Sequence, residues 1–420
     1  MASPFQPKIG IALSGGGSRA MAFHLGCLRT LWQLGILQQA RVLSTVSGGS
    51  VIGAMYAVHE GDFAQFDSQA QAVLASGFVR PALRTVFTTT EGLRAVISFV
   101  LVIAVWFWLV PYRFTMGVIG WATDRKGSDV VAGPEKWIPR RFSSRTTILR
   151  RTFDTMLFKG KVLGTLSTDR PKLVMVAAEL RTGSAFYYGR HATGSWRFGK
   201  IEHSQIPVAQ AVAASAAFPL LLPALDEFLL FRKPDSSLRS ERVTLTDGGV
   251  YDNLGLCPLW PDRDREISIG VEEIDTIVAC RAGYGLRTGN PSLFAVSRLR
   301  AAFNCTSNRT QHLSMNRLFD LKAAGRLKSF VLPYLDQDDD KLSYAPADLV
   351  SRASVAGYPT NFSAMPEEWI EKLSRRGEQL TLAVIREHAP ELLPPGWNFN
   401  TDHSDASQPS VCSNLASAAG

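Results

Sequence analysis

Residues 9–18 (Ile-Gly-Ile-Ala-Leu-Ser-Gly-Gly-Gly-Ser) and residues 42–50 (Val-Leu-Ser-Thr-Val-Ser-Gly-Gly-Ser) share one pattern, an apolar run that ends in a glycine turn. Helical stretches follow both turns, from about Arg19 to Leu34 and from the second turn to about His59. Alternating strands and helices are typical of a parallel sheet covered by helices. The sequence therefore predicts an α/β fold with a mostly parallel central sheet. Further strands are predicted at residues 173–178, 185–188, 243–246, 277–280 and 330–332.

The composition is that of a globular protein, because 46% of the 420 residues are hydrophobic and 20% are charged. A disordered chain or a polytopic membrane protein would depart from these values. The net charge is +8, and residues 125–151 concentrate it, with eight basic residues against two acidic ones. Such a cluster favours an anionic partner, either lipid or nucleic acid. The basic residues are Arg125, Lys126, Lys136, Arg140, Arg141, Arg145, Arg150 and Arg151.

The five cysteines are widely spaced and form no C-x-x-C pair, so no zinc or redox motif is predicted. They fit buried free thiols in a reducing compartment. No signal peptide is visible at the N-terminus, and we expect the catalytic part to face the cytoplasm. No D-x-D-x-D-G calcium loop occurs, and no metal or cofactor is expected.

Ser47 is the candidate nucleophile, because it lies between a predicted strand and a predicted helix in Thr45-Val46-Ser47-Gly48-Gly49. This is the setting of a nucleophile elbow, in which glycines allow the serine to project from the strand end. The N-terminus of the following helix favours negative charge at the same place. The usual pattern is G-x-S-x-G, and Thr45 replaces its first glycine. The alternative is a small-residue turn that packs a helix on a strand.

Gly15, Gly16 and Gly17 form a loop whose backbone N–H groups can approach a reacting oxygen closely, as in an oxyanion hole. The same loop fits the dinucleotide fingerprint G-x-G-x-x-A. That fingerprint requires an acidic residue about 20 positions later, and the chain has none before Glu60. No Gly-Lys-Ser/Thr follows the loop either, which excludes a P-loop. Arg19 is a candidate for orienting a substrate phosphate, or is a solvated residue of the first helical turn.

Asp247 is the candidate base, since it ends an apolar strand in Leu245-Thr246-Asp247-Gly248-Gly249. A carboxylate at a strand end can approach a nucleophile on a neighbouring strand end. The alternative is an ordinary turn, because Asp-Gly is among the commonest turn signals. Asp252 and Asn253 are interpreted as structural hydrogen-bonding partners.

Together these motifs resemble the patatin-like phospholipase family. A fourth match, Ala214-Ser215-Ala216-Ala217-Phe218-Pro219 followed by Pro223, is similar to the segment that precedes the family's aspartate. The resemblance covers roughly residues 8–75 and 165–280. It implies a three-layer patatin-like fold and a Ser47–Asp247 dyad that hydrolyses the ester bonds of phospholipids or related acyl lipids through an acyl-enzyme. The N–H groups of the glycine loop would form the oxyanion hole.

A Ser-His-Asp triad is the mechanistic alternative to this dyad. Its candidate histidines lie in no recognisable motif, and a lone histidine on a helix is more often a packing residue. A catalytically inactive membrane-binding module is the alternative function, and Thr45 is its sequence support. The candidate histidines are His24, His59, His191 and His203.

An apolar insert interrupts the α/β pattern at residues 76–164, and its run 95–110 has Ser98 as the only polar residue before Pro111. A helix of sixteen residues falls just short of a bilayer span. Because Ser47 precedes the run and Asp247 follows it, a single crossing would separate them. The remaining options are a hairpin with residues 114–122, an interfacial segment or a buried helix.

Tryptophans and basic residues beside the insert favour an anionic membrane surface over nucleic acid, for which the apolar run has no role. The predicted organisation is a catalytic core in two parts, 1–75 and 165–290, with the insert 76–164 between them. A mainly helical region 291–396 and a disordered tail 397–420 follow. The segment 358–362 has no predicted role beyond packing against the catalytic part.

Overall fold

The computed structural model describes residues 7–122, 141–191, 193–201, 205–219, 221–233, 235–264, 272–285 and 293–397. Three predictions fall wholly or largely outside these residues. They are the histidine at position 203, the tail beyond residue 397, and the basic residues at positions 125, 126, 136 and 140.

One mixed sheet forms the centre of the fold, and its parallel half holds the predicted site. The strand order is β10-β9-β1-β2-β3-β4-β5-β6-β7-β8, and every pairing from β10 to β3 is parallel. Apolar residues fill these strands because helices cover both faces of the sheet. The parallel strands are β1 (Ile9–Leu13), β2 (Val42–Val46), β3 (Lys172–Glu179), β9 (Thr276–Cys280) and β10 (Ser329–Val331).

The other half of the sheet is antiparallel, and its last strand in sequence pairs with β3. Strand β8 pairs with its hairpin partner β7 and also with β3, where Ala177 lies opposite Asp247. The catalytic candidate is therefore next to the parallel strands. The strands predicted at 173–178 and 185–188 are present as β3 and β4 and pair as an antiparallel hairpin, whereas β5, β6 and β7 were not predicted. The antiparallel strands are β4 (Ser184–Gly189), β5 (Thr193–Ser195), β6 (Gly199–Ile201), β7 (Leu225–Arg232) and β8 (Leu238–Asp247).

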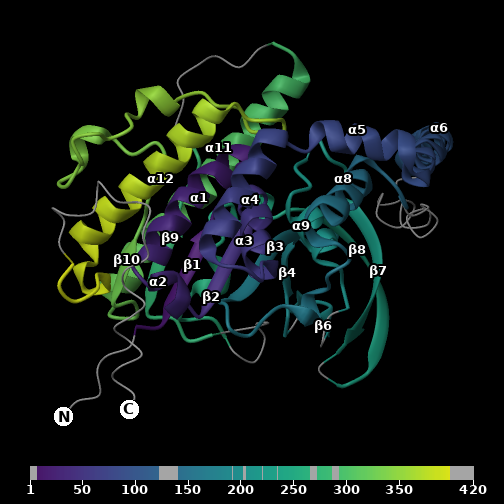
Figure 1. Cartoon of the computed structure of the whole chain (residues 1–420). Coiled ribbons are helices and arrows are strands. Elements are labelled where there is room, and N and C mark those ends of the chain that lie inside the picture. The colour runs from purple at the N-terminus through teal and green to yellow at the C-terminus, as the bar shows by residue number, and fades with distance from the viewer. Residues whose placement is uncertain are drawn as a thin grey trace.

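Helices pack on both faces of the sheet and give the three predicted layers. Alternate residues of β1 enter two separate apolar clusters, Ile11 and Leu13 on one face and Ala12 on the other. Figure 1 shows α1, α3 and α12 in front of the strands. The first face carries α1 (Gly17–Gln33), α2 (Ile36–Gln39), α3 (Gly48–Val58), α4 (Phe63–Ser76), α9 (Val208–Ser215) and α12 (Glu367–His388), and the second carries α10 (Gly249–Asp252) and α11 (Ala295–Ala323).

Helix α12 packs directly on α1, so the C-terminal region is joined to the first part of the core. Two glycines allow the helices to approach closely. A Cβ atom at Gly26 would lie 1.8 Å from the Ser374 carbonyl oxygen, and one at Gly377 would lie 2.2 Å from the Phe23 carbonyl oxygen. A close helix crossing of this kind leaves no room for a side chain at either position.

The α-helices in the described part of the insert lie at one end of the molecule and are α5 (Val79–Thr88), α6 (Thr90–Ala122) and α8 (Arg145–Phe153). Helix α6 runs through Pro111 without ending. The prediction that the helix ends at Pro111 is therefore wrong, and so is the option of a hairpin between 95–110 and 114–122. Proline removes one backbone hydrogen bond and bends a helix, but long apolar helices accommodate it. A buried helix is also excluded, because most described side chains of α6 are exposed.

Candidate active site

Ser47 lies on the turn between β2 and α3 in a strained backbone conformation. Its φ of 51° and ψ of −118° place a non-glycine residue in a region that L-residues rarely adopt. A serine at the N-cap of a helix usually accepts a bond from its own helix, but the Ser47 hydroxyl does not cap α3. The turn therefore directs the hydroxyl away from its own helix, as a nucleophile elbow does.

Ser215 holds this turn from the end of α9. Its hydroxyl oxygen accepts from the Ser47 N–H at 3.0 Å and donates to the Val176 carbonyl oxygen at 2.6 Å. Since that donation uses its proton, Ser215 accepts from the Ser50 hydroxyl at 2.8 Å, and Ser50 in turn accepts from Thr45 at 3.0 Å. Thr45, the departure from the usual motif, is thus part of the hydrogen-bond network that supports the Ser47 turn.

Asp247 lies at the end of β8 with its carboxylate in contact with Ser47. Burial raises its pKa to about 6, although the Gly249 N–H and the Ser47 hydroxyl lower it in part. Oδ1 accepts from the Gly249 N–H at 2.7 Å. Oδ2 is buried and makes no hydrogen bond of ordinary geometry within the described residues. The carboxylate therefore retains an unused acceptor oxygen.

The segment 214–217 also holds the backbone of the Asp247 turn. The Asp247 N–H donates to the Ala217 carbonyl oxygen at 3.0 Å, and the Gly248 N–H donates to the Ser215 carbonyl oxygen at 3.1 Å. Ser215 therefore bonds both the nucleophile turn and the aspartate turn. The sequence marked this segment through its resemblance to the family but did not indicate what its serine does.

The glycine loop lies against the Ser47 turn, and its three N–H groups differ. The Gly15 N–H already donates to the Asn253 carbonyl oxygen at 3.0 Å, whereas no hydrogen bond is found for those of Gly16 and Gly17 within the described residues. A Cβ atom at Gly15 would lie 3.3 Å from the Ser47 Cβ. Gly16 and Gly17, at the N-terminus of α1, are therefore the available donors, and Gly15 provides space beside the nucleophile.

Arg19 is buried, and two of its hydrogen bonds join separate parts of the chain. Nε donates to the Ala282 carbonyl oxygen at 2.9 Å, and Nη1 donates to the Tyr358 carbonyl oxygen at 3.0 Å. The guanidinium also stacks over the Tyr284 ring, 4.4 Å from its centroid. These contacts position the loop, and the role of Arg19 toward a substrate phosphate stays a prediction.

The segment 358–362, to which the sequence assigned no role, supports the glycine loop. The Asn361 carbonyl oxygen accepts from the Ser18 N–H at 2.8 Å, and a Cβ atom at Gly17 would lie 2.5 Å from the same oxygen. A further bond joins the Phe78 N–H to the Phe362 carbonyl oxygen at 2.8 Å. The C-terminal region thus forms one wall of the candidate site.

The described histidines bond neither member of the Ser47–Asp247 pair. The buried His24 has Nε2 3.0 Å from the Ser14 carbonyl oxygen, and His59 Nε2 lies 3.0 Å from the Asp62 carbonyl oxygen. His191 lines a separate pocket. As predicted, Asp252 is structural: its carboxylate accepts from three backbone N–H groups, those of residues 254, 255 and 257.

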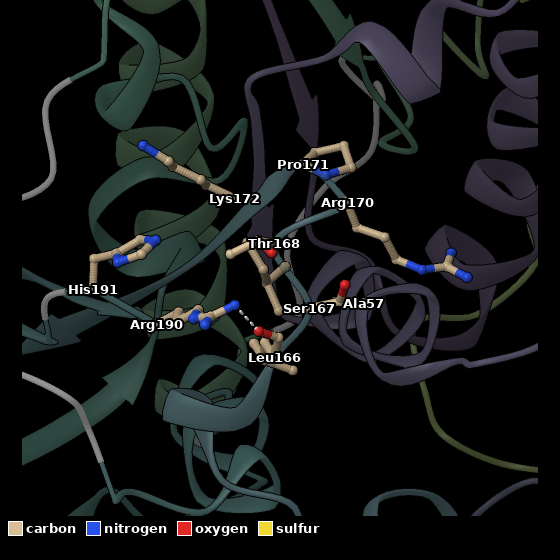
Figure 2. Close-up of a pocket in the computed structure, with 10 residues that line it drawn as sticks. Ala57, Leu166, Ser167, Thr168, Arg170, Pro171, Lys172, Arg190 and His191 are labelled. Atoms are coloured by element: carbon tan, nitrogen blue, oxygen red, sulfur yellow. Dashed lines mark hydrogen bonds between the residues drawn. The ribbon is translucent and has the colours of Figure 1, made fainter.

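A pocket of about 80 Å³ lies at the opposite edge of the sheet. Lys172, one of its lining residues, begins β3 and lies opposite Val42 at the start of β2, whereas Ser47 follows the end of β2. Figure 2 shows that the side chains of Lys172 and Arg170 point away from each other, and that Arg190 bonds the Leu166 carbonyl oxygen. The basic groups around this pocket do not converge on a common point.

The fold defines an α/β protein in which Ser47 lies on a strained turn between a strand and a helix. The sequence profile of the patatin-like phospholipase family matches residues 11–260, more than half of the chain, so the protein belongs to this family. The predicted patatin-like α/β fold is thereby confirmed. The chain matches no curated protein sequence.

Two solved structures illustrate the likeness. Human GIVD cytosolic phospholipase A2 is 13% identical with a TM-score of 0.49, and the match covers 92% of this chain and 59% of that one. VipD from Legionella pneumophila is 14% identical with a TM-score of 0.37, and the match covers 92% of this chain and 68% of that one. The chain therefore spans less than two thirds of the phospholipase A2 length.

Proposed function

We propose that the protein hydrolyses carboxylic ester bonds of phospholipids or related acyl lipids, with Ser47 as nucleophile and Asp247 as general base. The observation that carries this proposal is the strained Ser47 turn beside the buried Asp247 carboxylate, whose pKa is raised to about 6. A base of that pKa is ionised near neutral pH and still accepts a proton readily. Family membership supports the lipid substrate.

In the proposed reaction, the Ser47 oxygen attacks the ester carbonyl while Asp247 takes its proton. The carbonyl oxygen becomes an oxyanion, which the N–H groups of Gly16 and Gly17 and the N-termini of α1 and α3 stabilise. The protonated Asp247 then gives its proton to the leaving alcohol, and an acyl-enzyme remains. Water, deprotonated by Asp247, attacks the acyl group and releases the fatty acid.

The hydrogen bond of His24 favours a dyad over a triad. Its Nε2 bonds the Ser14 backbone, so its ring positions the loop and does not contact the Ser47 hydroxyl. A base in a triad has to lie within hydrogen-bond reach of the nucleophile. Among the described residues, Asp247 is the titratable group in contact with Ser47.

Covalent labelling tests this proposal against an inactive membrane-binding module. A fluorophosphonate is expected to form one adduct with wild-type protein, mapped to Ser47 by peptide mass spectrometry, and none with Ser47→Ala. The exposed Ser240→Ala on β8 is the matched control and should label like wild type. Wild-type protein should also release fatty acid from phosphatidylcholine in mixed micelles. A folded wild type that neither labels nor releases fatty acid would be the inactive module.

We also propose that α6 docks the enzyme on an anionic membrane, at its cytoplasmic face. Residues Thr90–Leu109 have the length and composition of a membrane-crossing helix, with a mean hydropathy of 2.2, and only 11% of the apolar window is buried. A helix that is apolar on every side is stable in lipid or in a protein core. The side chains of Arg145 and Arg151 on neighbouring α8 are exposed and complement anionic head groups. Exposed apolar residues of α6 include Leu93, Val96, Ile97, Phe99, Val100, Leu101, Trp106, Phe107, Trp108 and Phe114.

The path of the chain favours burial of α6 in one leaflet over a crossing. Ser143 donates to Glu91 at 2.8 Å, so the chain returns to the first turn of α6. If α6 crossed the bilayer, residues 123–140 would have to cross back, and seven of them are charged. Each charge at the bilayer centre costs roughly 2.5–3.5 kcal/mol on insertion scales. The dyad therefore stays on one side of the membrane.

Two aspartates in α6 are expected to abolish membrane binding. The double variant Val100→Asp/Phe107→Asp should reduce sedimentation with phosphatidylglycerol-containing vesicles at least ~10-fold, because each lost apolar side chain contributes roughly 1.5–3 kcal/mol. Hydrolysis of a soluble short-chain ester should not change. Leu313→Asp, an equally exposed apolar site on α11, is the matched control. Unaltered vesicle binding by the double variant would contradict the docking role of α6.

Ser215→Ala is expected to lower kcat for a short-chain p-nitrophenyl ester by about 10- to 100-fold and to leave KM nearly unchanged. Alanine cannot accept from the Ser47 N–H or donate to Val176, so the nucleophile turn loses its support. Ser215 is a positioning residue, and Ser240→Ala is its control. A change in KM alone, with kcat preserved, would count against this role.

A further inference from the structure

A buried cluster of three side chains of metal-binding type lies beside Ser14 and includes neither Ser47 nor Asp247. His24 and Cys27 are three residues apart on α1 and so share a face of the helix, and Cys280 is the last residue of β9. One ring nitrogen of His24 and the two sulfur atoms lie within 4.8 Å of one another. All three residues are at most 1% exposed.

The hydrogen bond of His24 leaves one ring nitrogen ready to bind a cation. Nε2 lies 3.0 Å from the Ser14 carbonyl oxygen, and because a carbonyl only accepts, Nε2 carries the proton. Nδ1 therefore holds a lone pair, and within the described residues it is buried without a hydrogen-bond partner. Metal-binding histidines typically donate their other N–H to a carbonyl in this way, which fixes the orientation of the ring.

We propose that His24, Cys27 and Cys280 bind a thiophilic divalent cation, with Zn²⁺ as the first candidate. Two thiolates and a neutral imidazole carry two negative charges, which Zn²⁺ neutralises, so the site can be buried without net charge. Cu⁺ suits the same soft ligands but would leave one negative charge in the core. Thr381 on α12 lies beside Cys27 and donates its proton to the Gly377 carbonyl oxygen at 2.7 Å, so its oxygen retains lone pairs and is the candidate fourth ligand.

The cation would join α1 to β9 next to the glycine loop. The Ser14 N–H donates to the Cys280 carbonyl oxygen at 3.1 Å, and the Ser14 carbonyl oxygen is bonded by His24. Both backbone groups of the residue before Gly15 are thus held by residues of the cluster. Binding would therefore fix the loop and stabilise the fold, because the cation binds the native state and not the unfolded chain.

Metal analysis of full-length protein tests this proposal without an activity assay. Protein produced with Zn²⁺ and then desalted is expected to retain about one equivalent, and Cys27→Ala/Cys280→Ala about 0.1 or less. The half-buried Cys257, outside the cluster, provides the matched control Cys257→Ala, which should retain as much as wild type. Circular dichroism checks that each variant is folded.

Cobalt provides a second measurement that needs no variant. Co²⁺ added to metal-free wild-type protein should give thiolate-to-cobalt charge-transfer absorption, and Zn²⁺ should abolish it. The proposal is overturned if folded wild type retains no zinc, if the double variant retains as much as wild type, or if Cu⁺ binds but Zn²⁺ does not. It is also overturned if the protein as isolated carries a Cys27–Cys280 disulfide, seen as the loss of two hydrogen masses.

Discussion

Asp247→Asn is expected to lower ester hydrolysis about 10³- to 10⁴-fold, because an amide cannot take the Ser47 proton. In wild-type protein, kcat/KM should rise with pH and level off above about 6, the pKa of the buried carboxyl. The measurement is a pH profile of p-nitrophenyl ester hydrolysis for both proteins. The exposed Asp235→Asn on the β7–β8 turn is the control and should keep the wild-type profile.

The same substitution is expected to stabilise the protein at high pH. Folding raises the pKa of Asp247 from 3.8 to about 6, so the native state binds more protons than the unfolded chain between those values. Stability of the wild type therefore falls as pH rises through this range. A shift of about two units corresponds to roughly 3 kcal/mol, and asparagine removes this cost.

Urea unfolding at two pH values measures this effect. At pH 8 the Asp247→Asn variant should be more stable than wild type by about 1–3 kcal/mol, and near pH 4 the difference should be small. An equal gain at both pH values would contradict the raised pKa. Lost activity together with increased stability is the combination expected of a residue that serves catalysis at a cost to folding.

Gly26→Ala is expected to destabilise the protein by about 3–5 kcal/mol, since a tight core contact cannot absorb an added atom. The new Cβ would lie 1.8 Å from the Ser374 carbonyl oxygen and 2.9 Å from the Glu378 nitrogen, both backbone atoms of α12. Backbone cannot rotate away as a flexible side chain can. The two helices would have to separate along their contact.

Thermal or urea unfolding followed by circular dichroism measures this loss. Gly283→Ala is the matched control, because its nearest neighbour would be a side-chain atom of Arg281 at 3.7 Å, an ordinary contact distance. It should change stability by less than about 1 kcal/mol. Gly26→Ala with wild-type stability would mean that α12 packs less closely on α1 than the structure indicates.

The catalytic candidates could be predicted from sequence because their signals are local. Ser47 and Asp247 each end an apolar strand beside glycines, although the antiparallel pairing of β8 with β3 that brings the two strand ends together could not be read from these motifs. The hydrogen-bond partners of these turns, in contrast, lie far away in the sequence. Gly15 donates to Asn253, and Ser18 donates to Asn361, and no local pattern encodes such pairs.

Other features were not predicted, because their residues lack a recognisable spacing or carry the signal of a different structure. The cluster of His24, Cys27 and Cys280 has no metal-binding spacing, because its members come together only when α1 packs beside β9. Pro111 is an ordinary signal for the end of a helix, yet α6 continues through it. Strand β7 was missed because its polar and apolar residues do not alternate, so its sequence shows no period of two.

Strand β3 aligns the Ser47 and Asp247 turns although it carries neither residue. Val176 lies opposite Val46, and Ala177 lies opposite Asp247 along the same edge of β3, because β4 occupies the other edge. Strands β2 and β8 therefore meet end to end along this edge, and the turns that follow them bring Ser47 beside Asp247. Deletion of one residue from β3 would turn the residues that follow it to the opposite face of the sheet. Ser47 and Asp247 would then no longer be aligned.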